Sequence, residues 1–211
     1  MTEFTFIRHG ETDWNRQARF QGQIDVPLNA AGLRQAERLA ARLSGHAPAA
    51  LYASDLQRAR QTAEALCRVW NLQVQLLPAF REQSFGMLEG IEVAAVPDQY
   101  PELWAAWVAH AADFALPGGG ESLRQFHDRV LEAVRALAAA HPGERLAVVT
   151  HGGVLDMLWR SARGLPLEGR RDCAIPNTGI NRLNWRDEKL EIEVWADAGH
   201  LEGIEVLGLS R

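Results

Sequence analysis

The hydrophobic and polar positions of the chain alternate between short apolar runs and longer segments with helical spacing. The short apolar runs, typical of buried strands, lie at 4–7, 50–53, 74–77 and 146–150. Segments in which apolar residues recur every three or four positions predict helices at 30–43, 56–70, 121–140 and 152–163. Two more strands are predicted at 180–185 and 190–195, on either side of a polar turn.

Strands that alternate with helices predict an α/β fold, in which helices cover both faces of a mostly parallel central sheet. Asn29 is expected to cap the helix at 30–43, and Ser54 or Asp55 the helix that begins near Leu56. No repeat or low-complexity linker divides the sequence, so residues 1–211 are expected to form one domain. The stretch at about 95–120, rich in Trp, Ala and Pro, predicts a helical insertion.

Composition and charge narrow the classes of partner. The net charge of -5 disfavours nucleic acid, whose binding depends on a basic surface. No stretch approaches the roughly 18 uninterrupted apolar residues of a spanning helix, and the first residues carry no basic leader, so no membrane partner and a cytoplasmic location are expected. Cys67 and Cys173 match neither a CxxC pair nor a disulfide framework, so both are expected to be reduced packing residues.

Two histidines occupy equivalent local settings. His9 and His151 each end a strongly apolar strand, and each is followed by glycine. Both are therefore expected at the carboxyl edge of the sheet, where ligands of such folds bind. Glycine lets the backbone approach a ligand closely, and a helix that starts at Gly152 would direct free N–H groups at an anion. This setting suits a phosphate group.

Two other interpretations of these histidines remain open. Each could be an ordinary hydrogen-bonded residue at a strand end, because histidine is often half-buried. A metal site is disfavoured, because none of the seven histidines has HxH, HxxxH or HExxH spacing. The sequence also has neither a GxGxxG motif nor a Walker lysine loop, so no organic cofactor is expected.

The segment from Arg8 to Thr12, with Asn15 after it, resembles the signature of the histidine phosphatase superfamily, the phosphoglycerate-mutase-like proteins. Further blocks of resemblance follow in order over almost the whole chain, at 20–28, 54–63, 81–90, 120–122 and 150–153. The block at 20–28 is similar to that of α-ribazole phosphatases and broad-specificity phosphatases. The resemblance implies an α/β sheet fold and a metal-independent phosphomonoesterase that works through a phosphohistidine intermediate.

The resemblance also implies roles for individual residues. It makes His9 the nucleophile, Glu82 the general acid and His151, if protonated, a ligand of the phosphoryl oxygens. Arg8 and Arg58 match the arginines that hold the phosphate, for which a planar guanidinium is suited. Additional phosphate contacts, of second rank after these, are expected from Asn15, Gln21, Gly22 and Gly152. Without the resemblance, Arg58 would be a solvated helix residue paired with Asp55, and Glu82 one of many surface carboxylates.

Three functions remain open within this resemblance. Mutases share the same residues but return the phosphoryl group to an alcohol and exclude water. The segment after Glu82 departs from the mutase pattern, and the chain ends soon after its last strand, so hydrolysis of a small phosphate ester is favoured over phosphoglycerate mutase activity. A catalytically silent binding protein is the third possibility.

The resemblance also suggests a homodimer. The insertion is expected over the active site, with Trp104 and Trp107 as an apolar lid or as a small helical core.

Overall fold

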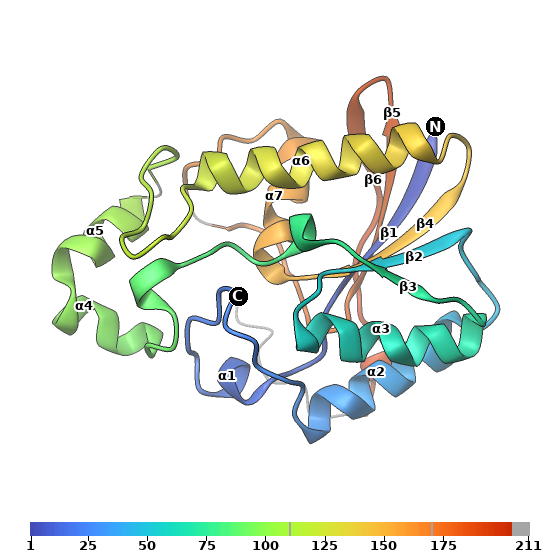
Figure 1. Cartoon of the computed structure of the whole chain (residues 1–211), viewed down its shortest axis with the longest axis horizontal. Helices are drawn as coiled ribbons and strands as arrows, with labels where there is room; N and C mark the ends of the chain where they lie inside the picture. Colours follow the sequence, from blue (N-terminus) through green and yellow to red (C-terminus); the bar gives the residue numbers. More distant parts are fainter. Residues whose placement is uncertain (110, 170, 204–211) are drawn as a thin grey trace.

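The computed structural model of the protein describes residues 1–109, 111–169 and 171–203, and is built on a sheet of six strands. The strand order across the sheet is β3-β2-β4-β1-β5-β6. Strands β1 to β4 run parallel, and β5 and β6 are antiparallel to their neighbours (Figure 1). The bounds are β1 Thr2–Arg8, β2 Ala50–Ala53, β3 Val74–Leu76, β4 Arg145–Thr150, β5 Ile180–Arg186 and β6 Lys189–Asp197. The predicted α/β fold is confirmed.

Helices lie on both faces of this sheet. Helices α2 and α3 pack together on one face, and α6 and α7 lie on the other (Figure 1). The α-helices are α1 Asp13–Arg16, α2 Ala30–Leu43, α3 Gln57–Trp70, α4 Val96–Gln99, α5 Pro101–Ala109, α6 Leu123–Ala140 and α7 Gly152–Arg163. Short 3-10 turns lie at Pro78–Phe80, Gly86–Leu88, Val93–Ala95 and Gly199–Leu201. Among the described residues, no helix is both long and apolar enough to cross a membrane.

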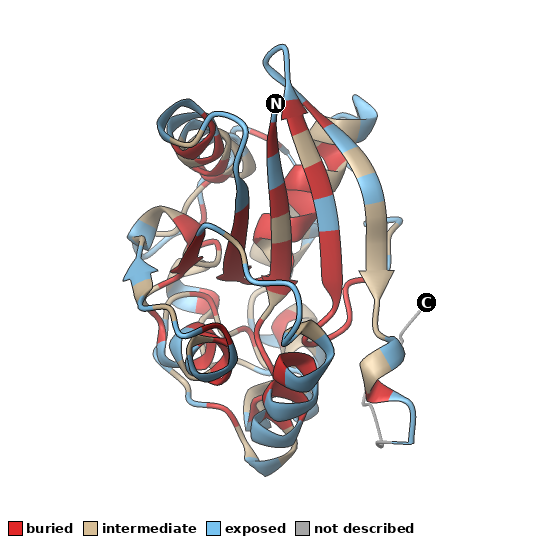
Figure 2. Ribbon diagram, turned by 90° about the vertical axis from the view of Figure 1, so that its right-hand side faces the viewer, coloured by how far each residue is buried: buried red, intermediate tan, exposed pale blue. Residues whose placement is uncertain are grey.

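The alternation of side chains along the strands divides the core into two layers. Phe4 and Phe6 of β1 face the layer under α6 and α7, whereas Ile7 faces the layer under α2 and α3. The central strands β2 and β4 are buried on both faces, while the edge strand β6 has mixed exposure (Figure 2). Both cysteines are free and pack against these two layers, as predicted.

The register of β1 and β4 brings the two strand-end histidines together. Arg8 pairs with Thr150, and the N–H of His9 donates to the carbonyl of Thr150 at 2.9 Å. The chain leaves β1 toward α2 on one face of the sheet, and leaves β4 into α7 on the other. This divergence is a topological switch point, the place where open α/β sheets bind ligands. The prediction that His9 and His151 lie at the carboxyl edge is confirmed.

The helical stretch at 95–109 projects to one side of the sheet (Figure 1). It encloses a small apolar core of its own, built on Phe20, Leu88, Val96 and Leu116. The ring of Trp107 makes edge contacts with Phe20 and Phe85, each at 5.3 Å between ring centroids. Trp104 packs against the same core. Both tryptophans thus have the packing expected of a small helical core.

One predicted helix cap and one predicted helix start are wrong. The N-cap of α3 is Leu56 and not Ser54 or Asp55, because the Asp55 carboxylate instead accepts two hydrogen bonds from Arg81, at 2.7 and 2.5 Å. Helix α6 begins at Leu123 and not at 121, since Ser122 caps it in a reciprocal capping box. The predicted cap at Asn29 is confirmed, because its side chain accepts from the N–H of Gly32.

Candidate active site

His9 lies at the end of β1 with one ring nitrogen already engaged. Its Nδ1 lies 2.6 Å from the carbonyl oxygen of Gly10. A carbonyl oxygen can only accept, so Nδ1 carries the proton and Nε2 keeps its lone pair. The carbonyl of His9 also accepts from Asn177 at 2.9 Å, which fixes the backbone that carries the ring. The imidazole is therefore oriented with its basic nitrogen free for chemistry.

His151 has the opposite tautomer. Nε of Arg58 donates to its Nδ1 at 3.2 Å, and because a guanidinium can only donate, the proton of a neutral His151 is on Nε2. The rings of His9 and His151 lie 5.2 Å apart between centroids. Nε2 of His151 is buried and has no hydrogen-bond partner among the described residues. The neighbouring rings thus offer one lone pair, on Nε2 of His9, and one N–H group, on Nε2 of His151.

Burial and two arginines keep both histidines uncharged. The pKa of His9 lies well below 6.5, first because the ring is buried, and then because of the charges of Arg58 and Arg8. The pKa of His151 is lowered well below 6.5 by its own burial, followed by the charge of Arg58. The condition attached to His151 in the sequence analysis, that it be protonated, is therefore not met in the free site. A neutral His151 can still donate from Nε2.

Arg58 is one of the most deeply buried side chains of the protein, at 1% exposure. Besides His151, it donates to the carbonyls of Ile24 at 2.9 Å and Gly22 at 2.7 Å. These bonds use three of its five N–H groups and leave two for an anion. Burial lowers its pKa to about 10, so it stays charged at neutral pH. The alternative of a solvated partner for Asp55 is wrong.

Arg8 and the start of α7 form another side of the site. Nη1 of Arg8 donates to the carbonyl of Ile175 at 2.6 Å, and Nε is buried without a partner among the described residues. Burial and then the charge of Arg171 lower the pKa of Arg8 to about 10, which leaves it charged. A Cβ on Gly152 would lie 3.6 Å from this Nε, so the first residue of α7 lies directly against the guanidinium. Cationic N–H groups and a helix N-terminus converge here, as an anion requires.

The Glu82 carboxyl group is held by two backbone N–H groups. Oε1 accepts from Gln83 at 2.9 Å, and Oε2 accepts from Gly153 at 3.0 Å. Gly153 is the second residue of α7, so the carboxyl group lies at the same helix N-terminus as Gly152. The side chain is half-buried, so Glu82 is not the solvated surface carboxylate that would be expected without the resemblance.

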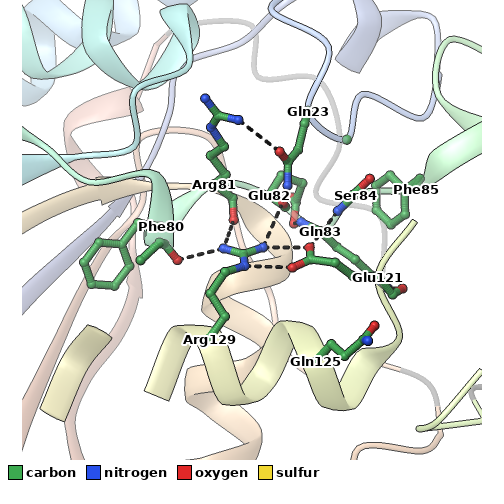
Figure 3. Close-up of polar contacts among 12 residues, drawn as sticks. Gln23, Phe80, Arg81, Glu82, Gln83, Ser84, Phe85, Glu121, Gln125 and Arg129 are labelled. Atoms are coloured by element: carbon green, nitrogen blue, oxygen red, sulfur yellow. Dashed lines mark hydrogen bonds and ion pairs between the residues drawn. The ribbon is translucent and has the colours of Figure 1, made fainter. Parts of the chain in front are cut away.

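A clamp formed by Glu121 and Arg129 fixes the segment that carries Glu82 (Figure 3). Arg129 donates to both carboxylate oxygens of Glu121, at 2.8 and 2.7 Å, and its remaining donors bind the carbonyls of residues 79, 81 and 82, at 2.7, 3.1 and 3.3 Å. Glu121 in turn accepts from the N–H of Ser84 at 2.9 Å. The backbone on both sides of Glu82 is therefore anchored to α6.

Of the residues of second rank, Gly152 begins α7, Asn15 lies in α1, and Gln21 and Gly22 lie in the loop that follows α1. Asn15 accepts from the N–H and the hydroxyl of Thr12, at 3.0 and 3.1 Å, and the Thr12 hydroxyl also lies 3.0 Å from the Gln21 side-chain oxygen. Gly22 has a φ of +51° and its carbonyl binds Arg58. A Cβ on Gly22 would lie 2.7 Å from Cγ of Glu89, so only glycine fits here. Glu89 accepts from Gln23 and Phe85, each at 3.0 Å.

Seven of the nine residues singled out from the sequence are thus linked by contacts around the two histidines, whereas Asn15 and Gln21 contact Thr12, three positions after His9. Sequence reasoning missed Arg129 and Arg171 altogether. Glu121 belongs to a block of the resemblance, but its partner Arg129 lies eight positions further on and carries no local signal. In the part of the chain that the structure describes, no cluster of three or more His, Cys, Asp or Glu side chains could hold a metal ion.

Comparisons with known proteins agree with this geometry. The family model "Histidine phosphatase superfamily (branch 1)" matches residues 4–198. The metal-independent phosphoserine phosphatase of Arabidopsis thaliana is 37% identical, over 98% of this chain and 86% of the relative. Phosphoglycerate mutase-like protein 4 of the same plant is 39% identical, over 95% and 87%. The solved mycobacterial glucosyl-3-phosphoglycerate phosphatase Rv2419c superposes with a TM-score of 0.81 at 29% identity, covering 92% of this chain and 98% of that one. The chain belongs to the histidine phosphatase superfamily and is a phosphatase of its branch 1.

Proposed function

We propose that the protein hydrolyses small phosphomonoesters, without a metal ion, in two steps through a phosphohistidine on His9. The observation that carries this proposal is the complementary pair of imidazoles. His9 presents a lone pair on Nε2, whereas His151 presents an N–H on Nε2, and the rings lie 5.2 Å apart. A nucleophile and a hydrogen-bond donor for the same phosphoryl group are what attack at phosphorus requires.

In the first step, the Nε2 lone pair of His9 attacks phosphorus and the bond to the ester oxygen breaks. The two free N–H groups of Arg58, Nε of Arg8 and Nε2 of His151 stabilise the charge on the three equatorial oxygens. Glu82, in its protonated form, gives its proton to the departing oxygen, so that a neutral alcohol leaves. The products of this step are phosphohistidine and a Glu82 carboxylate.

In the second step, water attacks the phosphohistidine. The Glu82 carboxylate takes one proton from the water, and the P–N bond breaks with its electron pair returning to Nε2 of His9. Orthophosphate leaves and Glu82 is protonated again for the next cycle. The clamp of Glu121 and Arg129 supports this dual role, because it anchors the backbone from which the carboxyl group must act twice.

A mutase activity is the second candidate, because relatives in this family are named as mutase-like proteins. The same nucleophile and acid would serve it, with a second alcohol in place of water. The departure of the segment after Glu82 from the mutase pattern supports hydrolysis. Phosphorus NMR with 3-phosphoglycerate, primed by 2,3-bisphosphoglycerate, distinguishes the two: hydrolysis gives orthophosphate, whereas a mutase gives 2-phosphoglycerate.

The proposal is tested by phosphate release from a panel of phosphomonoesters in excess chelator. The native protein is expected to release phosphate at the same rate with and without chelator, and His9→Ala is expected to release none. His46→Ala, which removes an exposed histidine far from the site in the fold, is the matched control. Rapid quenching under alkaline conditions should trap a phosphohistidine that maps to His9.

Release that disappears with chelator would contradict the metal-independent chemistry. Full activity of His9→Ala would contradict the nucleophile. Binding of phosphate esters without any release or transfer would favour the catalytically silent alternative.

The biological setting stays a prediction of the sequence. The proposed partner is a small phosphate ester, with no nucleic acid and no membrane. The net charge of -5 supports the absence of a nucleic-acid partner. The two free cysteines support the proposed cytoplasmic location. A homodimer is proposed from the family resemblance, and sedimentation of the purified protein tests it.

A further inference from the structure

Thr178 lies in a backbone conformation that threonine rarely adopts. It is the third residue of a tight turn, 176–179, which the N–H of Gly179 closes by donating to the carbonyl of Pro176 at 3.0 Å. Its φ is +54°, and this left-handed region is unfavourable for a β-branched side chain. A turn with positive φ at its third position ordinarily carries glycine or asparagine there. Backbone outliers of this kind persist only where the surrounding structure holds them, and they cluster at functional sites.

The turn lies directly against the backbone of the nucleophile. The N–H of Thr178 donates to the carbonyl of Arg8 at 3.0 Å and lies 3.4 Å from the carbonyl of His9. The neighbouring side chain of Asn177 donates to the same His9 carbonyl at 2.9 Å. The turn leads into β5, which pairs with β1, so the chain must reverse direction while it stays against the end of β1. The positive φ of Thr178 permits this reversal, and the turn thereby contacts both active-site residues.

A histidine from a distant segment holds the side chain of Thr178. Nε2 of His200 lies 3.0 Å from the hydroxyl oxygen of Thr178, a completely buried residue. Nδ1 of His200 is buried and has no hydrogen-bond partner among the described residues. Burial lowers the pKa of His200, so the ring is neutral at physiological pH. Neither chemical step proposed above uses this histidine, and its polar contact is with the strained residue.

The segment that carries His200 is itself fixed in the fold. It is the 3-10 turn Gly199–Leu201, whose first N–H donates to the Asp197 carboxylate at 3.0 Å and whose last residue is buried. Arg38 of α2 donates to the carbonyl of Glu202 at 3.0 Å, directly after this turn. His200 is therefore anchored on the side of α2, and from there it can hold Thr178 in place.

We propose that Thr178 and His200 are positioning residues. Their hydrogen bond holds the turn at 176–179 in its strained form, and the turn places the backbone of Arg8 and His9 for attack on phosphorus. This inference rests on the proposed role of His9 as the nucleophile. It adds two residues that contribute no group to the chemical steps and act only through the carbonyls of Arg8 and His9.

The strain and the hydrogen bond can be separated at Thr178. Thr178→Val keeps the β-branched shape but lacks the hydroxyl, so the unfavourable φ loses its support. Thr178→Gly also lacks the hydroxyl, but glycine adopts a positive φ at no steric cost. Thr178→Ser keeps the hydroxyl and serves as the conservative variant. The valine variant should therefore lose rate, whereas the glycine and serine variants should stay within about threefold of the native protein.

The rate to follow is that of phosphohistidine formation in a single turnover of p-nitrophenyl phosphate, because attack by His9 is the step that its position controls. A displacement of about 1 Å costs on the order of 100-fold in rate, so Thr178→Val is expected to lower this rate by about 10- to 100-fold. His200→Ala should cause a similar loss in the native background. In Thr178→Gly protein, which does not need the hydrogen bond, His200→Ala should change the rate less than about twofold.

His141→Ala is the matched control, because Nε2 of His141 also lies 2.7 Å from a buried hydroxyl, that of Tyr52. His141 precedes β4 and so lies at the amino end of the strands, at the opposite edge of the sheet from His9. Its replacement should lower Tm but leave the rate of phosphohistidine formation unchanged. Equal losses of rate in Thr178→Val and Thr178→Gly, or a native rate in Thr178→Val, would overturn the inference. A native rate in His200→Ala would remove His200 from it.

Failure of the proposed function can be told apart from failure of this inference. If the native protein forms no phosphohistidine, the proposed function fails whatever residue stands at position 178. Calorimetric binding of inorganic phosphate then tests the turn by itself, because the same turn places Arg8. Thr178→Val should weaken phosphate binding and Thr178→Gly should not. Equal affinities of the native protein and Thr178→Val would overturn the positioning role in that case as well.

Discussion

Gly153→Ala should disable the general acid without altering any ionisable group. A Cβ built on Gly153 lies 3.0 Å from Cδ of Glu82, closer still to Oε1, and 3.1 Å from a ring carbon of Phe126. Non-bonded carbon atoms prefer separations of about 3.5–4.0 Å, so the carboxyl group must retreat by about 1 Å. The retreat also weakens the hydrogen bond from the N–H of residue 153 to Oε2, which is 3.0 Å long in the native protein.

The expected loss follows from the role of Glu82. A misplacement of about 1 Å costs on the order of 100-fold in rate, and general acid catalysis as a whole is worth about 100- to 10,000-fold. We therefore expect kcat for an alkyl phosphate to fall about 100-fold, or about 2.7 kcal/mol in activation free energy. Stability should change little, because the helix preference of alanine over glycine, about 1 kcal/mol, is offset by the close contact with the buried ring of Phe126.

The assay measures kcat for glycerol 3-phosphate and for p-nitrophenyl phosphate, with Tm as the measure of folding. An aryl leaving group needs little protonation, so its rate should fall much less than that of the alkyl ester. Glu82→Gln provides the reference, since it removes the acid directly and should show the same difference between the two esters. An alkyl rate within threefold of the native one, or equal losses on both esters at an unchanged Tm, would refute the reasoning.

The other predictions concern the two buried histidines, the buried Arg58, and Trp107 in the small apolar core. Because the folded state keeps His9 and His151 uncharged, the free energy of unfolding should decrease as pH falls through 6.5, by up to about 2.7 kcal/mol per pH unit for the two. Arg58→Lys cannot replace three fixed donors, so kcat/KM should fall at least about 100-fold and Tm should fall, while Arg60→Lys on the exposed face of α3 should change neither. Trp107→Ala should lower stability, by less than the about 3–5 kcal/mol of a fully buried tryptophan because the side chain is partly exposed, and should lower the rates of all esters alike.

Each of these predictions has a contradicting result. Denaturant titrations at several pH values should show a shallower dependence for His151→Asn; an unchanged slope would mean that the histidine is not the group responsible. Native kinetics with Arg58→Lys would show that its hydrogen bonds to the backbone are not needed. A loss limited to bulky esters with Trp107→Ala would favour the apolar lid over the small core.

Much of the site could be predicted because its key residues are tied to strand ends. An apolar run that ends in His-Gly marks a carboxyl edge, and two such runs predict that His9 and His151 share it. That argument needs only the parallel sheet, which the alternation of strands and helices supplies. It does not need the order of the strands, although the pairing of β1 with β4 decides that the rings become neighbours.

The charge states could not be predicted in the same way. The sequence left the protonation of His151 open, because whether a histidine is charged depends on burial and on distances to other cations, which are properties of the folded chain. From helical spacing alone Arg58 would be a solvated residue, and only the family resemblance predicted that it binds phosphate, since helical spacing does not reveal which loop covers a helix start. Arg129 and Arg171 act through contacts with segments far along the chain, and no local pattern announces them.

The carboxylate of Glu89 joins two loops that the chain supplies separately. It fills the space left by the missing side chain of Gly22 and accepts from the backbone N–H groups of Gln23, in the loop at 20–23, and of Phe85, in the loop after Glu82. Neither loop can therefore be exchanged alone for that of a relative. An engineer who grafts a new segment at 84–120 to change the substrate must transfer residues 20–23 with it, because the two loops form one transferable unit.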